Sequence, residues 1–187
     1  MKDKNSNVLF FVRSLIIFVI IATFLLLIMR FGASRIRVEG MSMYPTLWDG
    51  ESVIINKVAY KNKDPERYDI VIFGSAIAET GFFIKRIYGL PGETIQIDKD
   101  GNIYVDDQLI DDPYAFEAME DAGRAANPIK LGEDEYFCLG DNRNHSEDSR
   151  FAIVGNVEKD KILGRVRIRI LPISKYGYID LYRKGQD

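Results

Sequence analysis

One serine in this 187-residue sequence stands where a nucleophile could work. Ser42 lies between Met41 and Met43, with Gly40 before the three residues and Pro45 shortly after them. Glycine and proline favour a tight, rigid turn on the protein surface. A serine hydroxyl is a weak nucleophile unless a neighbouring group takes its proton. The sequence therefore indicates a candidate nucleophile that needs a base, with an ordinary polar turn as the alternative.

A lysine in an apolar run is the first candidate for that base. Residues 82–88 read as a strand in which Phe83, Lys85 and Ile87 share one face. An ordinary lysine is neutral about once in 2,500 at pH 7, a deficit of roughly 4.6 kcal/mol. Desolvation on an apolar face lowers the pKa of a lysine by up to several units. Lys85 therefore fits a general base, and a lysine snorkelling at a strand edge is the alternative.

A dense polar loop at residues 140–150 offers a second kind of base. Its hydroxyl, amide and charged side chains are the partners that hold a polar site rigid. It contains His145, the only histidine, so a triad of Ser42 and His145 with Asp141 or Asp148 is formally possible. We favour the lysine, because its neighbours supply desolvation whereas the histidine lies among charged residues.

The bulk composition narrows the function classes. A formal charge of −3 gives no basic field for nucleic acid. Cys138 is the only cysteine, so no disulfide forms within the chain, and its apolar neighbours predict a buried small hydrophobe. Residues 98–101 suggest the start of a calcium loop, but Leu109 stands where position 12 needs a bidentate glutamate. We therefore expect no metal site there.

An apolar segment at residues 8–29 is long enough to cross a membrane. Only Arg13, Ser14 and Thr23 interrupt it, and it would span about 33 Å as a helix. A cleavable signal peptide is the alternative, but its apolar core is usually only about 7–15 residues. We expect a retained transmembrane helix in a lipid bilayer. Basic residues lie on both sides in nearly equal number, so the positive-inside rule leaves the orientation open.

The rest of the chain reads as short strands and turns. Asp100-Gly101 lies between two alternating runs, which is a strong hairpin signal. Residues 111–130 lack strand periodicity and are expected to form an excursion from the sheet. The fold class is therefore mainly β, an antiparallel β-sheet sandwich or barrel-like catalytic core with one N-terminal transmembrane α-helix. The strands expected are residues 53–55, 69–73, 94–98, 102–106 and 165–171.

Three segments, taken together and in this order, resemble the boxes of bacterial type I signal peptidases. Residues 40–47 resemble the nucleophile box, residues 67–71 with 84–93 the lysine box, and residues 140–150 a third box that is the most specific of the three. The similarity covers most of the chain beyond the apolar segment. The nucleophile turn alone is also similar to that of self-cleaving repressors of the LexA type, which share a Ser/Lys dyad.

The resemblance implies a role for each residue of the site. Ser42 would be the nucleophile and Lys85 the general base, in a mechanism without metal or organic cofactor. Ser146 matches the hydroxyl that orients the lysine, and Asp148 and Arg150 match residues that brace the site.

The resemblance also implies how substrate binds. A signal peptide would lie extended beside two edge strands, one before the nucleophile and one around residues 81–83. Shallow apolar pockets would accept small residues, typically alanine, at the first and third positions before the cut. The residues expected to bind substrate are Ile36, Val38, Met43, Pro45, Phe83 and Ile84.

The implied function is a membrane-bound serine endopeptidase that removes N-terminal signal peptides from exported preproteins. The implied location is the cell membrane, single-pass, with the catalytic domain on the extracytoplasmic side. The alternative is a signal-peptidase-like factor dedicated to surface-structure (pilus) assembly or to a few clients. The domains expected are a cytoplasmic N-terminus at 1–7, the transmembrane helix at 8–29, a juxtamembrane linker at 30–37 and the extracytoplasmic catalytic domain at 38–187.

The sequence departs from the family pattern at several places. Gly40 stands where Gram-negative members carry a serine hydroxyl two residues before the nucleophile, so the chain looks Gram-positive there. Tyr68 stands where a glycine is usual, and Tyr88 where a small aliphatic residue is usual. The segment 151–155, which follows Arg150, is longer than the corresponding segment of the family. These departures leave the dyad intact and bear on the surroundings of the substrate pocket.

Overall fold

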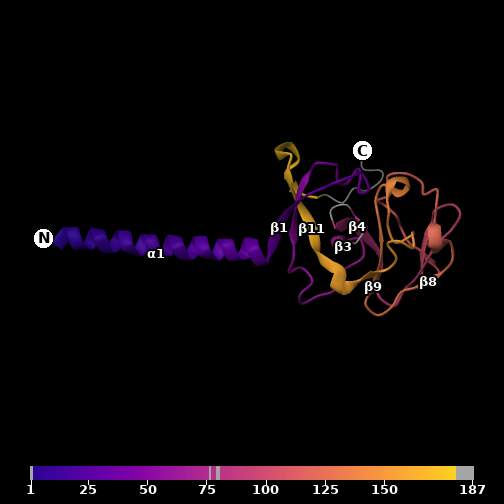
Figure 1. Ribbon diagram of the computed structural model, residues 1–187, viewed down its shortest axis with the longest axis horizontal. Coiled ribbons are helices and arrows are strands. Elements are labelled where there is room, and N and C mark those ends of the chain that lie inside the picture. The colour runs from indigo at the N-terminus through magenta and orange to yellow at the C-terminus, as the bar shows by residue number, and fades with distance from the viewer. Residues whose placement is uncertain (1, 76, 79–80, 180–187) are drawn as a thin grey trace.

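The computed structural model describes residues 2–75, 77–78 and 81–179. A single long helix, α1 (Lys2–Phe31), projects from a β-rich body (Figure 1). Within it Asn7–Leu27 forms a stretch of 21 residues with a mean hydropathy of 2.7, and none of the stretch is buried against the body. It is long and apolar enough to cross a membrane. The helix exceeds the expected bounds because the first helix-breaking residue in the chain is Gly32.

A large antiparallel sheet forms the main part of the body. It has eight strands in the order β1-β2-β11-β3-β4-β9-β10, with β12 paired to β11. β4 lies between β3 and β9, so the lysine-bearing strand is central (Figure 1). The strands are β1 (Ala33–Arg37), β2 (Ser52–Asn56), β3 (Ile70–Gly74), β4 (Phe82–Gly89), β9 (Glu135–Leu139), β10 (Val157–Glu158), β11 (Ile162–Leu171) and β12 (Gly177–Tyr178).

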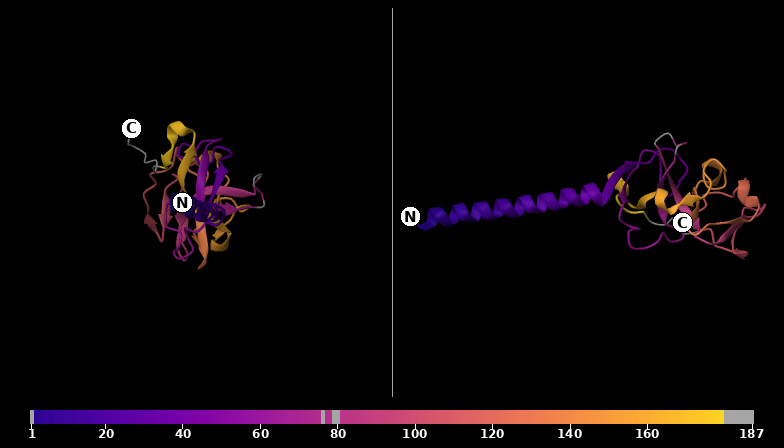
Figure 2. Two further views of the ribbon diagram at one scale, coloured as in Figure 1. Left: turned by 90° about the vertical axis from the view of Figure 1, so that its left-hand side faces the viewer. Right: turned by 60° about the horizontal axis from the view of Figure 1, so that its bottom comes forward.

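A smaller sheet of four strands lies at the end of the body away from α1 (Figure 2). Its order is β7-β6-β5-β8, and β5 pairs with β6 around the turn that contains Gly101, so the predicted hairpin is confirmed. The fold is thus mainly antiparallel β with one N-terminal helix, as the sequence predicts. The strands are β5 (Thr94–Ile97), β6 (Ile103–Val105), β7 (Gln108–Leu109) and β8 (Ile129–Lys130). The 3₁₀ helices are η1 (Gly123–Ala126), η2 (Arg143–His145), η3 (Lys159–Lys161) and η4 (Ile173–Lys175).

Two expected boundaries differ from the structure. Most of the expected linker at 30–37 is strand β1, in register with β2 from Ala33–Asn56 to Arg37–Ser52. The backbone of β1 pairs with β2 on the other side of the nucleophile loop, a partner that local sequence does not reveal. The expected excursion at 111–130 returns to a sheet at its end, where Ile129 of β8 pairs with β5.

Three buried clusters hold the body together and position the site. One cluster, around Tyr88, Ile95 and Phe137, joins the two sheets. A second contains Met43 and Leu47, so the loop between β1 and β2 is anchored in the core. The third lies on the other face of the large sheet, and Cys138 is buried there as expected. Strand β4 and the loops after β1 and β9 carry the polar residues described next.

Candidate active site

The loop between β1 and β2 carries Ser42 on a fixed backbone. The amide of Val38 donates to the Glu51 carbonyl at 2.8 Å and closes the base of the loop. Gly40 has a φ of +80°, a conformation that glycine adopts without strain. Its amide donates to a carboxylate oxygen of Asp49 at 2.9 Å. Ser42 is therefore half-buried on a braced turn, in line with the turn that the sequence predicts.

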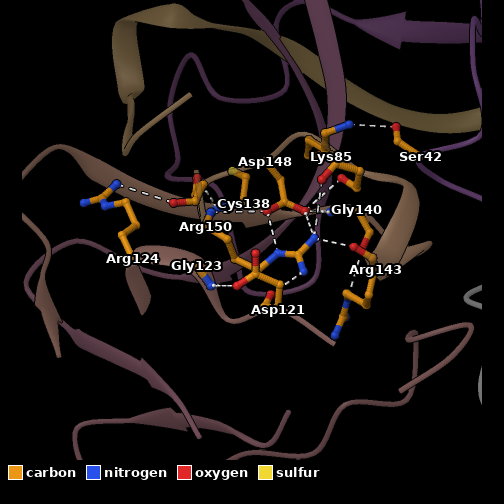
Figure 3. A network of polar contacts seen from close by, with 12 residues as sticks. Ser42, Lys85, Asp121, Gly123, Arg124, Cys138, Gly140, Arg143, Asp148 and Arg150 are labelled. Carbon is orange, nitrogen blue, oxygen red and sulfur yellow. Dashed lines mark hydrogen bonds and ion pairs between the residues drawn. The ribbon is translucent and has the colours of Figure 1, made fainter. Parts of the chain in front are cut away.

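Strand β4 brings Lys85 to this serine. The Nζ atom of Lys85 lies 2.7 Å from the Oγ atom of Ser42 (Figure 3). Lys85 is only 1% exposed, and its Nζ lies 4.9 Å from the centre of the Phe83 ring. Burial lowers the pKa of Lys85 to about 8, against an opposing effect of the Asp148 carboxylate. Proton abstraction near neutral pH requires an amine with a lowered pKa that is hydrogen-bonded to the hydroxyl, and Lys85 meets both conditions.

The loop after β9 holds the nucleophile loop from behind. The amide of Asn142 donates to the Ser42 carbonyl at 3.1 Å, and its side-chain Nδ2 donates to the Met41 carbonyl at 3.1 Å. Gly140 packs against the same backbone. A Cβ at this position would lie 2.5 Å from the Ser42 carbonyl and would clash with Ser146 Oγ, so only glycine fits.

The expected bracing residues Asp148 and Arg150 form one buried network with Ser146, the residue expected to orient the lysine. Figure 3 shows the contact between Asp148 and Arg150. Arg150 donates to both carboxylate oxygens of Asp148, through Nε at 2.8 Å and Nη2 at 2.9 Å. The amide of Gly140 donates to Asp148 at 3.1 Å. The hydroxyl of Ser146 also donates to Asp148, at 2.8 Å, whereas the hydrogen bond of Lys85 is with Ser42. Ser146 thus lies in the carboxylate network behind the lysine.

A second buried ion pair was missed by the sequence reasoning. Arg86 is fully buried, donates to both oxygens of Asp141 at 2.8 Å and 2.6 Å, and stacks over the Tyr114 ring at 3.8 Å. Thr46 of the nucleophile loop donates to the same carboxylate at 2.5 Å. The pair thus ties β4, the loop after β9 and the nucleophile loop together. The available signal was a charged residue inside an apolar strand, which needs a buried partner.

A small cleft of about 40 Å³ opens beside Ser42. Four of the six residues expected to bind substrate line it. Ile36 and Pro45 do not: Ile36 packs against the core cluster below β1, and the Pro45 carbonyl accepts a hydrogen bond from the Trp48 indole at 3.1 Å. The cleft residues are Val38, Glu39, Gly40, Ser42, Met43, Phe82, Phe83 and Ile84.

The histidine lies apart from the serine. Its side chain is 71% exposed, and the Nδ1 atom of His145 lies 3.6 Å from Glu117. The aspartates that would complete a triad are engaged elsewhere, Asp141 by Arg86 and Asp148 by Arg150. The geometry therefore favours the lysine as the partner of the serine.

Comparisons with known proteins identify the family of this chain. Residues 11–171 match the family model described as signal peptidase, peptidase S26. A probable signal peptidase I-2 of Synechocystis is 38% identical over 156 residues, which cover 80% of this chain and 68% of that protein. Signal peptidase I T of Bacillus subtilis is 33% identical over 181 residues, which cover 93% of this chain and 91% of that protein.

A crystal structure of a signal peptidase I from Enterococcus faecalis is 29% identical. It matches with a TM-score of 0.45, covering 55% of this chain and 97% of that one. The names of the relatives from Synechocystis and Bacillus subtilis favour a peptidase over an assembly factor for surface structures. The match of 161 of the 187 residues to one family model, with relatives above 30% identity, is decisive. This chain belongs to the signal peptidase family, peptidase S26, as a bacterial type I signal peptidase, a serine peptidase that removes signal peptides.

Proposed function

We propose that Ser42 and Lys85 form the catalytic dyad of a membrane-anchored endopeptidase that cleaves exported preproteins after small residues. One observation carries the proposal: a lysine amine only 1% exposed lies 2.7 Å from a half-buried serine hydroxyl. A buried lysine with a lowered pKa is competent to accept a proton near neutral pH.

The reaction runs in two halves. Neutral Lys85 takes the proton of Ser42 as the serine oxygen bonds to the scissile carbonyl carbon, and the resulting ammonium returns the proton to the leaving amine. The C–N bond breaks and leaves the signal peptide esterified to Ser42. Lys85, neutral again, takes a proton from water, whose oxygen bonds to the ester carbonyl carbon. The bond from that carbon to the Ser42 oxygen then breaks, the Lys85 ammonium returns the proton to that oxygen, and the signal peptide leaves as a carboxylic acid. The backbone N–H of Ser42 serves as one donor to the oxyanion, and Gly40 supplies no side-chain donor.

The size of the cleft supports cleavage after small residues. The cleft is small, with a volume of about 40 Å³. A cleft of this size favours the methyl group of an alanine over the longer side chain of a leucine. The side chains of Met43 and Ile84 are buried at its wall, so the cleft does not enlarge without repacking the core.

The proposed topology places one helix in the membrane. Residues 8–29 cross it once, residues 1–7 are cytoplasmic, and the catalytic domain at 38–187 lies on the extracytoplasmic side, where signal peptides emerge. The long apolar helix that leads directly into β1 supports a single crossing, and the resemblance to type I signal peptidases supports the orientation.

The test compares three variants of the full chain in detergent with a purified preprotein. Ser42→Ala and Lys85→Met remove the nucleophile and the base with little change in shape, and each is expected to lower kcat/KM at least about 10³-fold. Lys63→Met, at an exposed lysine, is the matched control and retains full activity. Full cleavage by either dyad variant contradicts the proposal. The length of the product, read by mass spectrometry on preproteins with alanine or leucine before the cut, tests the specificity.

A further inference from the structure

A fully buried arginine behind the active site is held from two distant parts of the chain. Arg143 is 1% exposed, and its guanidinium binds both carboxylate oxygens of Asp112, with Nη2 at 2.9 Å from Oδ1. Nη2 also donates to the Tyr88 hydroxyl at 2.7 Å, and Nε donates to the Gly140 carbonyl at 2.9 Å. The Tyr88 hydroxyl in turn donates to Asp112 at 2.5 Å. The cluster of Tyr88, Asp112 and Arg143 is therefore closed: each member bonds the other two.

This cluster lies one residue away from the groups that hold Ser42. Gly140, whose carbonyl Arg143 binds, packs on the Ser42 carbonyl, and Asn142 donates to that carbonyl at 3.1 Å. On its other side, the Arg143 carbonyl accepts a hydrogen bond from Arg150 at 2.5 Å. Arg150 is the partner of the carboxylate beside Lys85 (Figure 3). Arg143 is therefore connected through the segment 140–142 to the Ser42 backbone, and through Arg150 to the carboxylate that acts on Lys85.

Two tyrosines that depart from the family pattern build the support for this cluster. The rings of Tyr68 and Tyr88 meet edge to face, with centroids 5.4 Å apart, and Tyr68 also contacts Tyr114 at 5.2 Å. The Tyr68 hydroxyl donates to the carbonyl of Asp111 at 2.7 Å, next to Asp112. The start of the excursion at 111–130 is thereby fixed against β4.

We propose that Tyr88 and Asp112 are positioning residues for the dyad: through Arg143 they hold the segment 140–143 against the nucleophile loop. The inference rests on the proposed roles of Ser42 and Lys85 and adds a function for the excursion. The substrate cleft is lined by other residues, so loss of this support acts on the chemical step and leaves substrate binding nearly unchanged.

The pH dependence of kcat/KM distinguishes a positioning role from a purely stabilising one, because only a positioning residue alters the pKa of Lys85. Lys85 feels the acidic groups Asp148, Glu147 and Asp141 and the thiol of Cys138, and Asp148 acts most strongly to raise its pKa. Arg150 neutralises that carboxylate. If displacement of Arg143 loosens the Arg150–Asp148 pair, Asp148 acts on the amine with more of its charge, and the acid limb of the kcat/KM profile moves to higher pH.

The experiment uses the full chain in detergent and a preprotein substrate. Asp112→Asn keeps the shape of the side chain and removes its charge, and Tyr88→Phe removes one hydroxyl. Asp112→Asn is expected to lower kcat about tenfold with KM within twofold and to shift the acid limb upward. Tyr88→Phe is expected to lower kcat about threefold in the same manner. The matched controls are Tyr104→Phe and Asp98→Asn, which break a tyrosine–aspartate hydrogen bond of 3.3 Å in a turn away from the site and leave kcat unchanged.

Unchanged kcat and an unmoved pH profile in folded Asp112→Asn would overturn the inference. If that variant does not fold, wild-type kinetics of Tyr88→Phe overturn it. Equal losses in kcat for the variants and their controls also contradict it. The failure of the proposed function is a separate result, since it requires that Ser42→Ala or Lys85→Met remain active.

Discussion

At position 85, burial has two opposing consequences. It strips water from the amine and lowers the pKa of Lys85 to about 8, which makes proton abstraction feasible near neutral pH. It also leaves an ionisable group inside the core, which costs free energy of folding. Alternation in β4 predicts the burial of Lys85 beside Phe83, and the structure has them in contact. The pairing of Arg86 with Asp141 was not predictable, because it joins residues 55 positions apart.

The lowered pKa predicts the pH dependence of activity. The base must be neutral, so kcat/KM of the full chain is expected to rise about tenfold per pH unit below the pKa of Lys85 and to level off above about 8. The measurement is the rate of preprotein cleavage between pH 6 and 10 at constant ionic strength. A rate independent of pH across that range contradicts a titrating lysine.

The burial of Lys85 that supports activity is also expected to lower the free energy of unfolding, in a way that depends on pH. The folded-state pKa of about 8 lies below the ordinary value of 10.5, so the unfolded chain binds more protons between these values. Burial of Lys85 therefore destabilises the fold by roughly 3 kcal/mol below pH 8, and the penalty disappears as pH rises toward 10.5. Lys85→Met is expected to raise Tm more at pH 7 than at pH 10, and Lys63→Met is expected to change it at neither. An equal effect of Lys85→Met at both pH values contradicts the argument.

Among the elements, those with local signals were predictable and those with distant partners were not. The hairpin of β5 and β6 follows from alternation on both sides of Gly101. The resemblance predicts an edge strand before the nucleophile, but the start of β1 was missed, because Arg35 and Arg37 beside an apolar helix favour a charged linker. Short strands of two residues, such as β7 and β8, exist only through their neighbours in the sheet.

Strand β11 braces the nucleophile loop, which predicts the effect of removing one arginine. Arg169 donates to the Thr46 carbonyl at 2.5 Å and to Glu51 at 2.7 Å, and Glu51 is only 4% exposed. Arg169→Met is expected to lower the free energy of unfolding by about 3 kcal/mol, because Glu51 stays buried with Lys175 as a more distant cation at 3.3 Å.

Denaturant unfolding in detergent measures this loss. Arg167→Met, at an exposed arginine two residues earlier in the same strand, is the control and is expected to change stability by less than about 0.5 kcal/mol. In the double variant with Glu51→Gln, the loss is expected to be smaller than the sum of the two single losses, since one variant removes the partner of the other. Additive losses show that the two side chains are not coupled.

In the whole molecule, the membrane helix and the catalytic body are joined without a flexible spacer. α1 ends at Phe31 and β1 begins at Ala33, and the Gly32 carbonyl between them accepts a hydrogen bond from the Lys57 amide at 3.0 Å. β1 then leads within a few residues to the loop of Ser42 (Figure 1). In the proposed topology, with α1 in the bilayer, one short, paired strand sets the height of the active site above the membrane.

Because the junction is short and paired, we expect a flexible spacer inserted there to impair cleavage of membrane-bound preproteins but not of soluble peptides. Eight Gly/Ser residues inserted between Gly32 and Ala33 add a flexible link of about 15 Å. Cleavage of a short water-soluble peptide is expected to stay within about twofold, because the dyad and its braces are untouched. Cleavage of a membrane-bound preprotein in vesicles is expected to fall about tenfold, because the active site spends less time at the depth of the scissile bond.

The same insertion between Asp106 and Asp107, in the exposed turn before β7, is the control and affects neither substrate. Equal losses with both substrates indicate damage to the fold, and unchanged cleavage in vesicles shows that the junction does not set the height of the site.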